Sequence, residues 1–311
     1  MPTDTTLGGI PDGGHRTAAN PLPMKHILSY TRRALDDYGM IRSGERIAVG
    51  VSAGKDSLTL LCALARLRQF YPIPFELSAI TVDMGFGGIP GDYSGIRDLC
   101  RRLAIPYRVV PSDIAEIVFG IRKEQNPCSL CAKMRRGALH SAAREDGCTA
   151  VALGHHFDDV VETFMLNLFY EGRIGCFSPV TELSRTGIRL IRPLIYVPEK
   201  EIRAYAAAEA LPVVPSACPA NEHTERENMK QLLRTLERNN RGLRIASSAP
   251  CNVAGWTASA CRGGGTSVSR SRRKNTMRRT RHETKYSGRT VRLRLHGQDS
   301  PVRALQSSIL L

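Results

Sequence analysis

One short polar segment combines several groups that can bind and activate a phosphate. It reads Ser52, Ala53, Gly54, Lys55, Asp56 and Ser57. The lysine supplies a positive charge, the hydroxyls can donate hydrogen bonds, and the carboxylate is a hard ligand of the kind that Mg²⁺ prefers. The spacing does not match the Walker pattern G-x-x-x-x-G-K-[ST]. An ordinary glycine-rich turn is the alternative, but a lysine and an aspartate directly after the glycine are more than a turn requires.

Two cysteines, Cys128 and Cys131, form a second group with chemical potential. They lie three residues apart near the start of an expected helix, so both thiols fall on one helix face. We expect the helix dipole and the nearby cations Lys133, Arg135 and Arg136 to lower the pKa of these thiols. A single C-x-x-C is compatible with a redox pair, half of a zinc site or part of an iron–sulfur site. No second C-x-x-C supports a four-cysteine zinc site.

Three further cysteines are candidates for a third ligand. Cys148 precedes an expected buried strand and is better explained as a small core residue. Cys176 lies in a loop and is less suited to the role. Cys218 lies in the proline-bounded loop 215–219, which is rigid, non-helical and at a strand end, and such a position suits a ligand.

Strands and helices must alternate along the chain to position these groups. Apolar runs predict strands at residues 47–51, 75–82, 107–110, 149–153 and 188–191. Helical periodicity predicts helices at 24–40, 57–70, 92–103, 129–143, 158–170, 198–210 and 222–239. Such alternation indicates an α/β fold, with a doubly wound, mostly parallel sheet built from right-handed βαβ units.

Ligands of such sheets bind at the carboxyl ends of the strands. Residues 52–57, Asp83 and residues 154–159 all follow expected strands, so we expect them to converge on one crevice. In the last segment, His155 and His156 are better explained by lining a nucleotide pocket or by packing than by binding a metal. Either Asp158 or Asp159 could instead cap the helix that follows.

The apolar stretch after Asp159 contains residues predicted to be core, namely Phe164, Leu166, Leu168 and Phe169. Tyr170 and Phe177 could stack on a nucleic acid base. Core packing is the stronger interpretation for both.

Composition limits the class of protein. With 311 residues and 42% apolar residues, the chain can bury a sizeable core. No apolar run is long enough to cross a membrane, and the N-terminus lacks the apolar segment of a secretory signal. We therefore expect a cytoplasmic protein with no membrane partner and with reduced cysteines, a setting that favours metal or catalytic roles over disulfides.

The charge is distributed unevenly. Residues 244–311 hold 14 of the 44 Lys and Arg but only two of the 29 Asp and Glu, so this tail carries most of the net charge of +15. We divide the chain into a disordered segment at 1–22, a folded domain at 23–243 and a basic, low-complexity tail at 244–311 that we expect to be disordered. The tail is either an arm that contacts RNA phosphates or a spurious sequence such as a frameshifted reading. We favour the second.

Five motifs in order give the chain a family resemblance. They are SAGKDS at 52–57, PCSLCAKMRRG at 127–137, ALGHHFDD at 152–159, FMLNLFYEG at 164–172 and IRPL at 191–194. Together they resemble the tRNA 2-thiocytidine synthetase family, whose PP-loop domain is of the adenine nucleotide α-hydrolase type. The resemblance covers roughly residues 24–244.

The resemblance implies an ATP-dependent enzyme. Such an enzyme adenylates the C2 oxygen of a cytidine, expected to be cytidine 32 in the tRNA anticodon loop, and replaces it with sulfur. It implies a [4Fe-4S] cluster held by Cys128, Cys131 and, by motif position, Cys218. ATP and Mg²⁺ would bind at residues 52–57 together with Asp83 and Gly154. Lys55, Asp56 and Asp159 are the implied catalytic residues. The implied partners are tRNA and a sulfur donor such as a cysteine desulfurase, and a homodimer is compatible with this assignment.

The chain departs from the family pattern at two positions. Ala53 replaces a glycine, which costs little unless that residue needs a positive φ. Ser216 stands where the family often has a second cysteine beside Cys218. The alternatives are a 2-thiouridine synthetase, a lysidine synthetase or a non-catalytic iron–sulfur RNA-binding protein. The lysidine enzyme would not need Cys128 and Cys131, and the 2-thiouridine enzymes generally carry zinc-finger cysteines, which residues 1–60 lack.

Overall fold

The computed structural model of the chain describes residues 22–122, 127–184, 186–215, 217–219 and 225–243. These residues form one six-stranded sheet in the order β3-β2-β1-β4-β6-β5. The strands are β1 (Glu45–Gly50), β2 (Phe75–Val82), β3 (Tyr107–Val110), β4 (Ala150–Ala152), β5 (Val180–Leu183) and β6 (Ile188–Ile191). All neighbouring pairs are parallel except β5 and β6. The mostly parallel α/β fold predicted from the sequence is confirmed.

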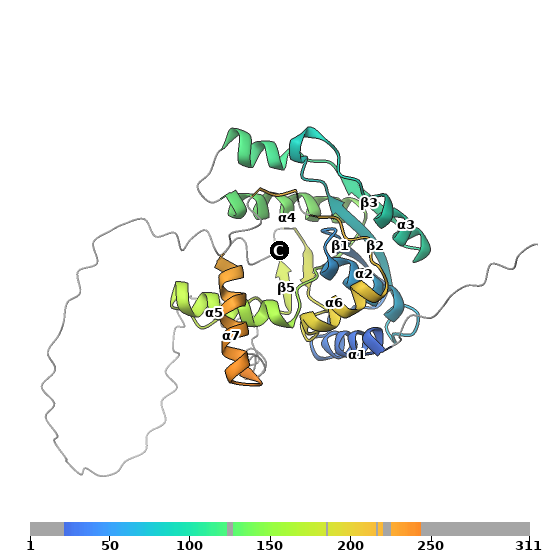
Figure 1. Cartoon of the computed structure of the whole chain (residues 1–311). Helices are drawn as coiled ribbons and strands as arrows, with labels where there is room; N and C mark the ends of the chain where they lie inside the picture. The colour runs from blue at the N-terminus through green and yellow to red at the C-terminus, as the bar shows by residue number, and fades with distance from the viewer. Residues whose placement is uncertain (1–21, 123–126, 185, 216, 220–224, 244–311) are drawn as a thin grey trace, which may run out of the picture.

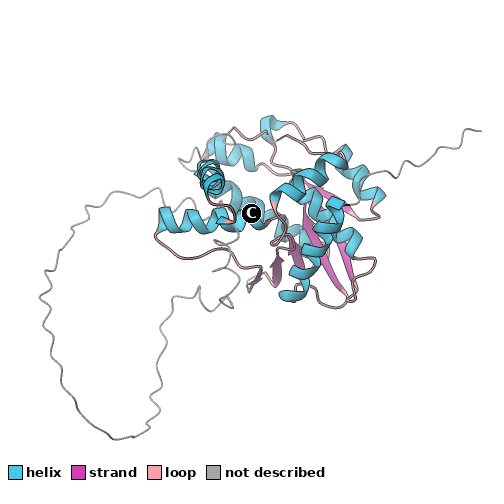
Figure 2. Ribbon diagram, turned by 60° about the horizontal axis from the view of Figure 1, so that its bottom comes forward, coloured by secondary structure: helices cyan, strands magenta, loops and turns pink. Residues whose placement is uncertain are grey.

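Helices surround this sheet (Figures 1 and 2). They are α1 (Leu22–Asp37), α2 (Lys55–Leu67), α3 (Ser94–Arg102), α4 (Pro127–Glu145), α5 (Phe157–Glu171), α6 (Glu199–Ala208) and α7 (Glu225–Asn239). A 3₁₀ turn, η1 (Phe86–Gly88), and a short π-helix, η2 (Glu116–Ile121), lie between β2 and α4. Helices α1, α2, α3 and α6 contribute to the core on one face, and α4 covers the other face. Helix α5 packs against α7.

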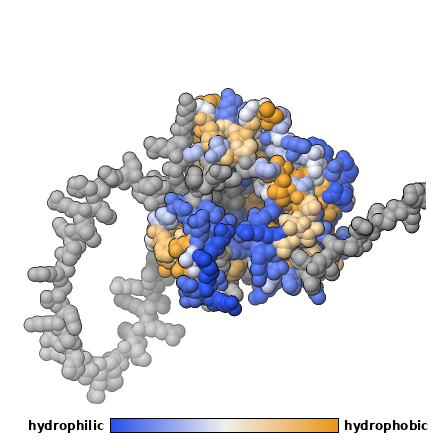
Figure 3. Space-filling model, in the orientation of Figure 1, coloured by the Kyte–Doolittle hydropathy of each residue, from blue (hydrophilic) through white to orange (hydrophobic). Residues whose placement is uncertain are grey.

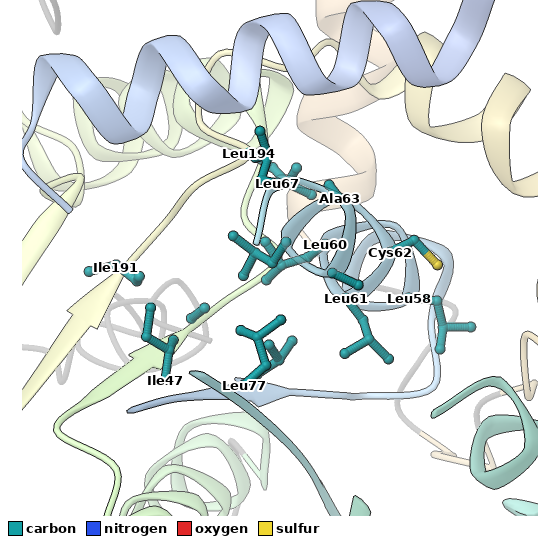
Figure 4. Close-up of a cluster of buried hydrophobic side chains, with 14 of the residues drawn as sticks. Ile47, Leu58, Leu60, Leu61, Cys62, Ala63, Leu67, Leu77, Ile191 and Leu194 are labelled. Atoms are coloured by element: carbon teal, nitrogen blue, oxygen red, sulfur yellow. The ribbon is translucent and has the colours of Figure 1, made fainter. Parts of the chain in front are cut away.

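The central strands are buried on both faces, as parallel strands between helix layers must be. Ile47, Leu77 and Ile191 point from three strands toward α2 (Figure 4). Ala48, which alternates with Ile47, belongs instead to the core under α4. Register is fixed on both sides of β1, where Val49 pairs with Ala79 of β2 and with Ala152 of β4. The carboxyl ends of β1, β2 and β4 therefore lie next to one another.

Strands β2, β3 and β6 have the predicted bounds, and the other predicted elements are present with shifted ends. In the described part of the chain, three elements were not predicted, namely the antiparallel edge strand β5, the 3₁₀ turn η1 and the π-helix η2. The assignment of Leu168 and Phe169 to the core was wrong, because their exposed fractions are 37% and 57%. Contact with α7 buries α5 through Val161 and Leu166, and the last turn of α5 extends beyond this small core.

The predicted disorder concerns residues outside the described ones, except for Leu22, which begins α1. The basic tail 244–311 likewise lies outside the described residues. Within the described part of the chain, no helix is both long enough and apolar enough to span a membrane.

Candidate active site

The ends of three strands meet at one cavity of about 730 Å³. The loop that follows β1 contributes five residues to its lining, namely Ser52, Ala53, Gly54, Asp56 and Ser57. Asp83, Gly154 and Asp159 join them from the ends of β2 and β4, as the topology predicted. Lys55 does not contribute to the lining.

The loop 52–57 is held in shape by its own hydroxyl groups. The backbone N–H of Ser52 donates to Ser57 Oγ at 3.1 Å, and Ser57 Oγ donates to the carbonyl of Gly54 at 3.0 Å. Gly54 is the N-cap of α2, and no side chain caps the helix. The first N–H groups of α2 therefore open onto the cavity, as an anion site requires. At Gly154, an added Cβ would come within 3.0 Å of the backbone nitrogen of Ser57, so β4 can approach the loop only through a glycine.

Ala53 takes the left-handed conformation, with φ 64°. The condition named for this position is therefore met, and the Cβ of Ala53 carries the cost of a positive φ. Its carbonyl accepts a hydrogen bond from the N–H of Val214 at 3.0 Å. This bond ties the loop directly to the segment that leads to Cys218.

Lys55 is engaged by carboxylates. Its Nζ lies 2.9 Å from Asp56 Oδ1 and 3.1 Å from Glu199 Oε1. Burial disfavours the charged amine, but Asp56 and Glu199 outweigh it and raise the pKa of Lys55. Burial also acts against the ionised Glu199, yet Arg203 and Lys55 lower its pKa to about 2. The lysine thus stays protonated beside the cavity, with its charge already balanced.

Asp83 shapes a loop with both of its carboxylate oxygens. Oδ1 accepts the N–H of Gly85 at 3.1 Å, and Oδ2 accepts the N–H of Gly91 at 2.9 Å. The two bonds fix both ends of the glycine-rich loop that contains η1. Burial and the neighbouring Asp83 raise the pKa of Tyr93, on the same wall of the cavity, to about 12.

His156 caps helix α5, so the alternative that Asp158 or Asp159 is the N-cap was wrong. The N–H of Asp159 donates to His156 Nδ1, and Asp159 Oδ2 accepts the N–H of His156 at 2.9 Å, which makes a reciprocal capping box. Asp158 turns away and accepts the N–H of Glu199 at 2.7 Å. Asp159 is the carboxylate of this pair that reaches the cavity.

Asp159 is also tied to α7. Arg226 Nη1 lies 3.2 Å from Asp159 Oδ1 and 3.1 Å from Glu162 Oε2. Burial acts to raise the pKa of Asp159, but His156, His155 and Arg226 outweigh it and lower that pKa. His156 Nε2 lies 3.6 Å from Asp56 Oδ1, so one imidazole stands between the two candidate carboxylates.

The second histidine is a packing residue. His155 is buried against Phe177, with ring centroids 4.9 Å apart. Burial and Arg192 lower the pKa of His155 to about 3, so the ring is neutral. Phe177 is buried too, which confirms its assignment to the core. The same assignment was wrong for Tyr170, because this side chain is 40% exposed and its hydroxyl donates to Glu225. In the described part of the chain, no three His, Cys, Asp or Glu side chains lie close enough to hold a single metal ion.

Two of the three candidate cysteine ligands line the same cavity as the loop. Cys128 and Cys131 occupy the first turn of α4, and Cys131 and Cys218 line the cavity. The expected lowering of the thiol pKa values was wrong. Burial raises the pKa of both Cys128 and Cys131, Cys218 raises them further, and only for Cys131 does Arg135 act in the opposite direction. Burial and the neighbouring thiols thus outweigh the effect of the cation Arg135.

The three thiols fit an iron–sulfur cluster better than a single ion. They are soft donors, and they lie near enough for one thiol to raise the pKa of another. None of the three is fully buried. Each thiolate of a [4Fe-4S] cluster binds a different iron, so the thiols need not converge on one point. The other two candidates do not line the cavity: Cys148 is buried in the core, and Cys176 Sγ lies 3.4 Å from the carbonyl of Val160. Ser216 lies outside the described residues.

The fold and the cavity define a nucleotide-binding α/β protein of the PP-loop class. A family model described as a PP-loop domain matches residues 25–236. A tRNA-cytidine(32) 2-sulfurtransferase of Pelobacter propionicus is 42% identical over 208 residues, which are 66% of this chain and 77% of that relative. The Geobacter sulfurreducens enzyme of the same name is 40% identical over 222 residues, 70% of this chain and 84% of the relative. The chain therefore belongs to the PP-loop family and, within it, to the tRNA-cytidine(32) 2-sulfurtransferases.

The chain is also similar to a solved structure of a tRNA thiolase. The U34-tRNA thiolase NcsA from Methanococcus maripaludis, determined with its [4Fe-4S] cluster, superposes with a TM-score of 0.61 and 26% sequence identity. The match covers 74% of this chain and 78% of NcsA.

Three residues of the site were not singled out from the sequence, namely Arg226, Glu199 and His156 as a cap. The signal for His156 was available, because a polar residue three positions before an acidic one can form a capping box. Nothing local marks Arg226 or Glu199, since each meets its partner only in the folded chain.

Proposed function

We propose that this chain is an ATP-dependent tRNA thiolase that replaces the C2 oxygen of cytidine 32 in the anticodon loop with sulfur. One observation supports this most strongly: the PP-loop residues and the thiols of Cys131 and Cys218 line a single cavity. A nucleotide and a sulfur-carrying group held there would meet at the same base. The 40% identity to cytidine(32) sulfurtransferases favours cytidine over uridine as the target.

The chemistry needs activation because a carbonyl oxygen is a poor leaving group. Transfer of AMP from ATP to the C2 oxygen makes that oxygen a good one and releases pyrophosphate. The N–H groups at the start of α2 and the hydroxyls of Ser52 and Ser57 would hold the phosphates. Both oxygens of Asp56 accept hydrogen bonds from Lys55 Nζ, and those of Asp159 are held by the N–H of His156 and by Arg226. Asp56 is the better candidate for a Mg²⁺ ligand, because the phosphates that accompany Mg²⁺ would draw Lys55 away from it.

Cys128, Cys131 and Cys218 would hold the [4Fe-4S] cluster. When bound, a cluster with three cysteine ligands supplies an open iron site that can carry sulfide. The chain's own part is to hold the activated base near these thiols and to limit the access of water, since the thiols are half-buried. The proposal includes a separate sulfur donor such as a cysteine desulfurase and a cytoplasmic location.

The function is tested by nucleoside analysis of bulk tRNA. Cells that lack the gene should lack 2-thiocytidine, and the intact gene should restore it, whereas a gene encoding Lys55→Ala should not. Restoration of 2-thiouridine or lysidine instead would refute the cytidine assignment. ATP–pyrophosphate exchange in the presence of tRNA separates an enzyme from a protein that only binds RNA.

The ligand set is tested by iron and sulfide analysis of anaerobically purified protein. Cys128→Ala, Cys131→Ala and Cys218→Ala should each lose most of the iron. Cys148→Ala is the matched control, because this thiol is buried away from the cavity, and it should keep a full cluster. A full cluster in Cys218→Ala would remove the third ligand from the proposal.

A further inference from the structure

Apolar side chains gather beside the cavity, on and directly after the short helical segment η1 and on the neighbouring segment η2. We define the apolar rim as Phe86, Ile89, Phe119 and Ile121. Phe86 and Ile89 line the cavity together with Cys131 and Cys218. Figure 3 shows hydrophobic surface at the top of the molecule, where Figure 1 draws the short helix above α4. The rim thus lies beside the thiols rather than on a remote face.

Ile89 and Ile121 of the rim are exposed, whereas Phe86 and Phe119 are half-buried, so part of each ring is open to solvent. The exposed fractions of Ile89 and Ile121 are 74% and 67%. Leaving such side chains in water forgoes roughly 25 cal/mol for each Å² of apolar area. Gly87 and Gly88, at the crest of the same loop, have positive φ, and an added Cβ would meet no atom within 4 Å. The crest therefore faces open space.

The rim is also held in place. The rings of Phe86 and Phe119 contact each other across the two segments, with centroids 6.1 Å apart and an interplanar angle of 44°. Asp83 fixes both ends of the η1 loop through the N–H groups of Gly85 and Gly91. A fixed aromatic pair loses little entropy when a ligand stacks on it.

Charge beside the rim favours a nucleic acid. Arg135 lines the same cavity, and the exposed Arg122 directly follows Ile121. A base that enters a cavity must leave its stack, and the bases next to it then lose a stacking neighbour. We propose that the apolar rim is a stacking platform for unpaired bases of the RNA loop next to the target base. This inference rests on the proposed function and specifies where the protein holds the RNA loop.

The test measures binding of an anticodon stem–loop RNA by fluorescence anisotropy. Phe86→Ala and Phe119→Ala should each weaken binding by about 5- to 150-fold, the range that follows from roughly 1–3 kcal/mol per stacked base. Phe86→Trp and Phe119→Trp should bind the RNA like the unmodified chain, because an indole ring can stack on a base as a phenyl ring does. The dependence of binding on salt should keep its slope, since stacking releases no counterions.

Phe70→Ala is the matched control. Phe70 is 53% exposed and follows the carboxyl end of α2, at the opposite edge of the sheet from the cavity. It should bind the RNA like the unmodified chain. ATP affinity should be unchanged in Phe119→Ala, which shows that the fold is intact, because Phe119 does not line the cavity.

The outcomes separate the two proposals. Equal RNA affinity in Phe86→Ala, Phe119→Ala and Phe70→Ala would refute the stacking platform and leave the rim as a protein-binding surface, even if thiolation proceeds. Loss of binding in the two rim variants, with no thiolation by the unmodified chain, would support the platform and refute the proposed function.

Discussion

Replacement of Ala53 by glycine tests how the nucleotide loop is built. The left-handed φ of 64° costs an alanine roughly 1–2 kcal/mol relative to glycine. Two terms oppose the gain from relieving it. The methyl group is only 4% exposed, and its burial is worth about 0.8 kcal/mol. Glycine also gives the unfolded chain more freedom, which costs about 0.4–1 kcal/mol. The terms nearly cancel, so the free energy of unfolding should change by less than about 1 kcal/mol.

Two other alanines provide the comparison. Ala104 and Ala210 also have positive φ, of 51° and 44°, but both are exposed. Glycine relieves the same clash there without loss of a buried methyl group. Ala104→Gly and Ala210→Gly should therefore each stabilise the fold by about 0.5–1 kcal/mol, and more than Ala53→Gly does.

Urea denaturation of the three variants measures these differences as shifts of the midpoint at constant slope. Ala53→Gly should keep its ATP affinity within a few-fold, because the carbonyl of residue 53 still accepts the N–H of Val214. Greater stabilisation by Ala53→Gly than by Ala104→Gly would refute the burial argument. Destabilisation by both exposed replacements would refute the assignment of strain to positive φ.

Three further changes have definite expected results. Lys55→Ala should abolish ATP–pyrophosphate exchange but keep its iron, because the lysine and the cysteines lie on different segments. Glu162→Gln should remove a pH dependence of stability. Burial raises the pKa of Glu162 from its ordinary 4.5 to about 7, so the folded chain binds the proton more tightly than the unfolded chain does. The unmodified protein should therefore lose up to about 3 kcal/mol of stability as the pH rises from about 4.5 to 7. Urea midpoints across this range check it, and an equal slope in both proteins would contradict it. Truncation after Arg244 should leave iron content and exchange unchanged; a flatter salt dependence of tRNA binding would show that the tail contacts phosphates.

The parallel sheet could be predicted because buried strands and amphipathic helices have strong local patterns. The edge strand β5 could not, because its residues Val180–Leu183 are half-exposed or exposed and lack a buried apolar run. It forms through antiparallel pairing with β6, a tertiary event. The π-helix η2 was missed for a related reason: its hydrogen-bonding pattern leaves no separate periodicity in so short a segment.

Convergence of the loop, Asp83 and Gly154 also followed from the sequence, because strand ends share one edge of a sheet. The partners of each group did not. Arg226 lies 67 positions after Asp159 and reaches it only because α7 packs on α5. Sequence reasoning thus located the cavity and many of its residues, but it could not tell which charges are already paired.

That pairing affects how the site would bind a nucleotide. Lys55 is held by Asp56 and Glu199, and Asp159 is held by Arg226 and the N–H of His156. An incoming polyphosphate would have to draw Lys55 away from carboxylates that keep its charge balanced. The lysine would then exchange one set of anions for another. It would not be left as an unpaired, half-buried charge, which would cost more free energy. Asp56, released in the same exchange, loses its nearest cation just when a phosphate-bound Mg²⁺ could replace it. The ion pairs seen here are therefore consistent with a site that keeps its charges compensated both before and after ATP binds.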